Sequence, residues 1–116
     1  TTDKEIAKEN FQGNFQEKIV KCQTIQNILD NSKYKNKKID FLNIDVEGAE
    51  MKVLSTLNFE IYDPSLICVE ILGYREMQSE QREKEIKNNE IFKFLVNHGY
   101  KKVWSGLSYC SHLFTK

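Results

Sequence analysis

The apolar positions along the chain follow two periods: an alternation typical of strands, and a three-to-four-residue spacing typical of helices. Short apolar runs predict strands at 17–24, 38–46, 65–72, 100–106 and 107–116. Helical spacing predicts helices within 24–32, 47–57 and 89–100. In this order the elements predict an α/β fold. Its open sheet is mostly parallel, and its last two strands form an antiparallel pair.

Individual residues add detail to the predicted helices, strands and domain limits. Thr24 is a good N-cap for the first helix, and Gly99 suits the position just after the end of the last one. The run 38–46 is almost continuously apolar, which predicts a strand buried on both faces of the sheet. Residues 1–16 show no convincing period. We therefore expect a loosely ordered leader there and one domain over 17–116.

Composition and charge narrow the range of partners. The chain has 116 residues and a formal net charge of zero, so we expect neither nucleic acid nor anionic lipid as a partner. Its apolar runs are far shorter than the roughly 20 residues that span a bilayer, and its first residues are too polar for a signal peptide. These features predict a cytoplasmic protein.

The three cysteines agree with that location. Cys22, Cys68 and Cys110 are odd in number, lack a C-x-x-C spacing and each lie within an apolar, strand-like segment. The pattern predicts buried, reduced thiols rather than a disulfide framework or a zinc site.

Acidic residues gather where the second predicted strand ends. Asp45, Glu47 and Glu50 follow that strand, and Glu70 lies near the same end of the next one. Neighbouring strands are about 4.8 Å apart, and open α/β sheets bind ligands beyond the carboxyl ends of their strands. We therefore expect Asp45 and Glu70 to face one ligand. Both suit Mg²⁺, but two carboxylates make a thin site and no metal is assigned.

Simpler roles exist for several of these residues. Asp45 can cap the following helix, and Glu47 and Glu50 can favour the positive end of that helix. Gly48 permits close backbone approach or relieves strain in the turn. A carboxylate such as Glu70 inside an apolar strand is harder to explain, because its burial costs free energy unless it is paired.

The two histidines and the large aromatic residues have structural explanations. His98 is expected at a helix end, where an imidazolium complements the dipole, and His112 as a packed or surface residue of the last strand. Trp104, Phe92 and Phe94 are expected in the core.

The segment 37–57, KKIDFLNIDVEGAEMKVLSTL, resembles the signature of the FkbM family of S-adenosylmethionine-dependent methyltransferases. Similar segments follow the family's order, so that the resemblance spans about residues 17 to 115. They are VKCQTIQNILDN, DPSLICVEIL and IFKFLVNHGYKKV. The specific part is the block from Asp45 to Glu50.

The resemblance implies a class I methyltransferase sheet, which is Rossmann-like. The predicted strands from 38–46 onward would be its fourth to seventh. It also implies methyl transfer from S-adenosylmethionine to a hydroxyl of a sugar or natural product. Asp45 would lie beside the transferred methyl or the acceptor hydroxyl. Glu70 is the second catalytic candidate, from its position at the end of the neighbouring strand and not from the resemblance. Asp45, Glu47 and Gly48 would contact the cofactor.

One feature of the family pattern is missing. No Gly-x-Gly motif occurs, and the five glycines are scattered singly. The chain therefore resembles the C-terminal half of such an enzyme and is expected to be inactive alone, so its status as an enzyme stays open. The alternative is a non-catalytic α/β module for binding or assembly. A half-sheet has an exposed edge, which predicts self-association or an N-terminal partner.

Overall fold

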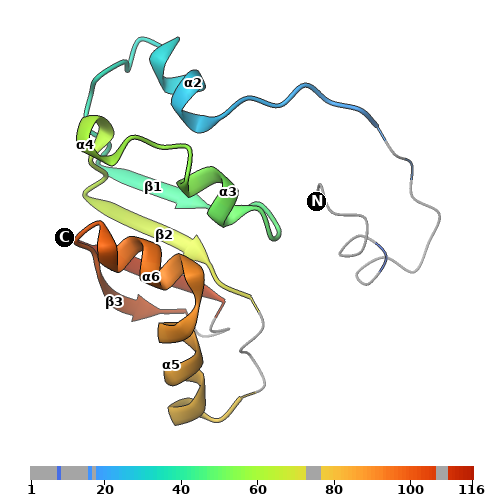
Figure 1. Ribbon diagram of the computed structural model, residues 1–116, viewed down its shortest axis with the longest axis vertical. Coiled ribbons are helices and arrows are strands. Elements are labelled where there is room, and N and C mark those ends of the chain that lie inside the picture. Colours follow the sequence, from blue (N-terminus) through green and yellow to red (C-terminus); the bar gives the residue numbers. More distant parts are fainter. Residues whose placement is uncertain (1–7, 9–15, 17, 73–76, 107–109) are drawn as a thin grey trace.

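The computed structural model describes residues 8, 16, 18–72, 77–106 and 110–116, and its centre is a four-stranded sheet (Figure 1). The strands are β1 (Phe41–Ile44), β2 (Leu66–Glu70), β3 (Lys101–Ser105) and β4 (Ser111–Thr115). The helices are α2 (Ile25–Asp30), α3 (Glu50–Leu54), α4 (Phe59–Tyr62), α5 (Ser79–Asn88) and α6 (Glu90–Asn97).

The strand order is β1-β2-β4-β3. β1 and β2 are parallel, whereas β4 runs antiparallel to both of its neighbours. This arrangement confirms the predicted α/β fold and the antiparallel pair at the end of the chain. Because β1 and β2 are parallel, their carboxyl ends meet at the same edge of the sheet.

The core lies between the sheet and its helices. Alternate residues of the two central strands, including Ile67, Val69 and Phe114, have no exposed surface. Figure 1 shows α3 and α6 over the same face of the sheet, and these helices contribute the fully buried Leu54 and Leu95. This packing holds the carboxyl ends of β1 and β2 in fixed relation to α3.

The predicted helix boundaries of α2 and α6 are confirmed. The Thr24 side chain accepts a hydrogen bond of 3.1 Å from the Asn27 backbone N–H, as an N-cap should. Gly99 follows α6 with a φ of +86°, a conformation that glycine adopts at little cost. None of the described helices combines the length and the apolar character that a bilayer-spanning helix needs.

The strand predicted at 17–24 is wrong for the residues described there. Residues 18–24 form no strand and are exposed, and Glu17 lies outside the described residues. Ile19 and Val20 are an isolated apolar pair between charged residues, so they have too little apolar surface to hold a strand in the core. Cys22 is exposed for the same reason rather than buried as predicted, although none of the three cysteines forms a disulfide.

The second face of the sheet is more open than the sequence predicted. Phe41 is 55% exposed, so β1 is not buried on both faces, and Trp104 is 53% exposed rather than in the core. Cys68 and Cys110 are only half-buried. Phe92 and Phe94 do pack against the core. The apolar run of β1 thus fills one face of the sheet and leaves the other accessible.

Candidate functional site

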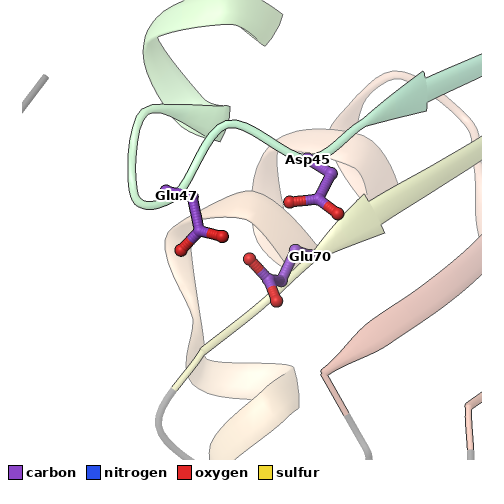
Figure 2. Close-up of side chains that lie close together, drawn as sticks. All are labelled: Asp45, Glu47 and Glu70. Atoms are coloured by element: carbon purple, nitrogen blue, oxygen red, sulfur yellow. The ribbon is translucent and has the colours of Figure 1, made fainter. Parts of the chain in front are cut away.

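Three carboxylates meet at the carboxyl ends of β1 and β2 (Figure 2). Ile44 pairs with Val69, so Asp45 and Glu70 each lie one residue further along two parallel strands. Glu47 reaches the same place from the loop that follows β1. One oxygen from each of the three carboxylates lies within 4.8 Å of the other two. The predicted proximity of Asp45 and Glu70 is therefore confirmed, and Glu47 joins them.

The loop that carries these residues is not part of a helix. The helix predicted at 47–57 begins only at Glu50, and its N-cap is Ala49, which makes no side-chain cap hydrogen bond. Capping therefore explains neither Asp45 nor Glu47. Glu47 and Gly48 both have positive φ angles, +53° and +95°. The glycine at position 48 thus serves the backbone conformation of the turn.

Electrostatics single out Glu70 within the group. Its pKa is raised, first because burial disfavours the charged form, and then because Asp45, Glu47 and Glu50 add negative charge nearby. Its Oε2 atom is shielded from solvent and has no hydrogen-bond partner in the described part of the chain. Buried polar atoms without a partner are uncommon, and strain, a bound water or ion, or a catalytic role can account for them.

Cys68 does not add a nucleophile to this group. Burial and the nearby charge of Asp45 raise the pKa of its thiol, which keeps the thiol protonated. The site is therefore one of carboxylate chemistry. Such a group can accept a proton from a hydroxyl, stabilise a cationic ligand or supply the hard oxygen ligands that Mg²⁺ prefers.

Neither histidine belongs to this group, since His98 lies at the end of α6 and His112 pairs with Val69, on the opposite face of the sheet from Glu70. His98 is the C-cap residue of α6, and its Nδ1 lies 2.8 Å from the carbonyl oxygen of Phe94. Its ring packs 4.5 Å from the ring centre of Phe59. His112 is fully buried, and its Nδ1 lies 3.0 Å from the hydroxyl of Ser105.

Sequence reasoning missed the role of Glu50 beside the site. It is 4% exposed, and its Oε1 accepts hydrogen bonds from the backbone N–H groups of Val46 (3.0 Å) and Gly48 (3.2 Å). One signal was available: Glu50 shares a helix face with the apolar Leu54 and Leu57. An acidic residue on such a face has to find a buried partner.

Comparison with known proteins gives one match. The family model described as a methyltransferase FkbM domain matches residues 1–102 of the 116-residue chain. The matched region contains Asp45, Glu47 and Glu70. No curated protein and no solved structure matches the chain.

Proposed function

The chain belongs to the FkbM methyltransferase family, and we propose that it forms the acceptor-side, C-terminal part of an S-adenosylmethionine-dependent O-methyltransferase. The acceptor is a hydroxyl group of a sugar or natural product. In this proposal β1 to β4 correspond to the fourth to seventh strands of a class I, Rossmann-like sheet. Their parallel first pair and antiparallel last pair support that assignment.

The observation that supports the proposal most is the state of Glu70. Its raised pKa makes it a stronger proton acceptor than an ordinary carboxylate, and its Oε2 has no partner among the described residues. A substrate hydroxyl would supply the missing hydrogen bond. Asp45, exposed at the same edge, is placed to orient that hydroxyl from the other side.

In the proposed methyl transfer the carboxylates accept a proton and stabilise positive charge. When bound, S-adenosylmethionine supplies an activated methyl on a sulfonium, and transfer breaks the carbon–sulfur bond while a carbon–oxygen bond forms. The hydroxyl proton passes to Glu70 or Asp45. The three carboxylates fit a sulfonium because their negative charge complements the cation. Alignment of the hydroxyl by Asp45 and Glu70 contributes further to the rate.

The same proposal includes an incomplete cofactor site. Asp45, Glu47 and Gly48 are assigned to the methyl end of the cofactor, but no Gly-x-Gly turn occurs to hold its nucleoside end. We expect titration calorimetry to show no submillimolar binding of S-adenosylmethionine by this chain alone. Submillimolar binding would contradict the half-site view and favour a complete site.

Catalysis is tested by Asp45→Asn in the chain joined to the glycine-rich segment of a family member. Release of S-adenosylhomocysteine is measured over a panel of hydroxyl acceptors. We expect turnover to fall by about 10²- to 10⁴-fold, the range for loss of an acid–base group, while the unfolding midpoint does not fall, because removing one charge relieves repulsion in the cluster. Asp40→Asn, an exposed carboxylate before β1, is the control. Parallel loss of turnover and stability would mean that Asp45 is structural.

A second candidate function, a non-catalytic module for binding or assembly, is favoured by the open sheet face. Phe41 and Trp104 are each more than half exposed, and β1 is the end strand of the described sheet. Open edges and apolar faces invite pairing, either with a second copy or with an N-terminal partner. Light scattering during gel filtration tests this idea. A well-folded monomer at high concentration would count against self-association.

The proposed location is the cytoplasm. Cys22 is exposed and Cys68 and Cys110 are half-buried, yet no disulfide joins any two of the three. Free thiols persist in reducing compartments, which supports this location.

A further inference from the structure

Glu50 is a buried acid whose carboxylate binds the backbone of the preceding turn. It is the first residue of α3 and is 4% exposed. Its Oε1 accepts hydrogen bonds from the N–H groups of Val46 at 3.0 Å and Gly48 at 3.2 Å. One carboxylate oxygen therefore holds both ends of the three-residue segment 46–48.

That segment has a conformation that needs such support. Glu47 has a φ of +53°, which a residue with a side chain rarely adopts, and Gly48 has a φ of +95°. Backbone of this kind persists only when the surrounding structure holds it in place. Hydrogen bonds to an ionised carboxylate are among the strong ones, so Glu50 is suited to this task.

The anchored segment 46–48 fixes the positions of two of the three carboxylates. Asp45 immediately precedes the first anchored residue, Val46, and Glu47 lies between the two anchored N–H groups. The third carboxylate, Glu70, is set independently by the pairing of β2 with β1 and β4. Figure 2 shows Asp45 and Glu47 directed toward Glu70 from this loop.

We propose that Glu50 is a positioning residue: by anchoring the N–H groups of Val46 and Gly48, it holds the Asp45 and Glu47 carboxylates against Glu70. The importance of Glu50 for methyl transfer rests on the proposed function. Its role in placing the Asp45 and Glu47 carboxylates does not depend on that function. Glu50 acts through the backbone and touches no reacting atom.

A purely electrostatic role at the start of α3 is the competing explanation. A negative charge there interacts favourably with the helix dipole, whatever its hydrogen bonds. The two explanations separate with Glu50→Gln and Glu50→Ala. Both variants remove the charge, but only glutamine keeps an oxygen in place to accept the two N–H bonds. Glu50→Asp provides the converse test, because it keeps the charge and shortens the reach.

The experiment follows the carboxyl of Glu70 by ¹³C NMR during a pH titration of each variant. In Glu50→Ala and Glu50→Asp the Glu47 carboxylate leaves its place. We therefore expect the pH at the midpoint of the Glu70 titration to be lower in Glu50→Ala than in Glu50→Gln, although both variants lack the Glu50 charge. Glu47→Gln alone should also lower the midpoint, and adding Glu47→Gln to Glu50→Ala should lower it no further.

Amide hydrogen exchange gives an independent measurement of the anchored turn. We expect exchange at Val46 and Gly48 to become at least about tenfold faster in Glu50→Ala, as the loss of hydrogen bonds to a charged group predicts. Glu50→Gln should retain slow exchange. If Glu50→Ala does not fold, Glu50→Asp replaces it in the exchange measurement, and its Glu70 midpoint is compared with that of the wild type, which carries the same charge; a lower midpoint in Glu50→Asp is then expected.

Equal Glu70 midpoints in Glu50→Ala and Glu50→Gln, or unchanged exchange at Val46 and Gly48, would overturn the positioning role. Neither measurement requires cofactor or acceptor. Methyl transfer that survives replacement of both Asp45 by Asn and Glu70 by Gln would overturn the proposed function and leave the role of Glu50 in the turn intact. The two failures are therefore distinguishable.

Discussion

Replacing Glu70 by glutamine should make the protein more stable at neutral pH. The folded state raises the pKa of Glu70 through burial and through the charges of Asp45, Glu47 and Glu50. Folded protein therefore binds this proton more tightly than unfolded protein. Stability then falls as pH rises from the unfolded pKa, about 4.3, through the folded one. Glutamine has the same shape and never acquires the charge.

The size of the gain follows from the geometry of the cluster. Two unit charges 4.8 Å apart repel by about 1 kcal/mol in water and by about 3 kcal/mol at an effective dielectric constant of 20. Asp45 and Glu47 are exposed, so the value for water is the better guide. Removing the Glu70 charge relieves both pairs, and we expect a gain of about 2 kcal/mol at pH 7.5.

Urea unfolding at a series of pH values measures this gain. The difference between Glu70→Gln and the wild type should be largest at pH 7.5 and should shrink toward zero below about pH 3, where Glu70 is protonated in both states. Asp40→Asn removes one exposed negative charge at the other end of β1 and controls for net charge. A variant less stable than wild type at pH 7.5, or a gain independent of pH, would refute the electrostatic argument.

Two further predictions concern contacts outside the site. The Tyr62 hydroxyl donates a 2.6 Å hydrogen bond to Asp30 and holds the pKa of that carboxyl below its usual value. Tyr62→Phe should therefore raise the pKa of Asp30, measured by NMR, and speed hydrogen exchange in α2 more than in the sheet; equal acceleration everywhere would contradict a local tether. Asp63 binds Lys116 and Lys38, which lower its pKa to about 2, so its contribution to stability is present above pH 4 and is lost as pH falls toward 2. Thermal unfolding of Asp63→Asn should show lower stability at pH 7 and a flatter decline below pH 4; an unchanged acid limb would refute this.

Much of the site was predictable because its position depends on strand ends. The sequence predicted a strand that ends at the acidic block and a second one with Glu70 near the same end. Parallel pairing then brings Asp45 and Glu70 together whatever the details of packing. Glu47 was expected beside the cofactor, but its position against Asp45 and Glu70 was not predicted, since that position depends on a left-handed turn rather than on a helix beginning at position 47.

Local pattern by itself determined the α/β class, the cap at Thr24, the stop at Gly99 and the gathering of acids after β1, because each depends on residues close together in the chain. Tertiary structure decided which apolar segments find a partner. Residues 18–24 stay exposed, and Phe41 and Trp104 face solvent. It also decided the role of Glu50. A carboxylate on an apolar helix face is stable only where backbone donors meet it, and the folded turn at Val46 and Gly48 supplies them.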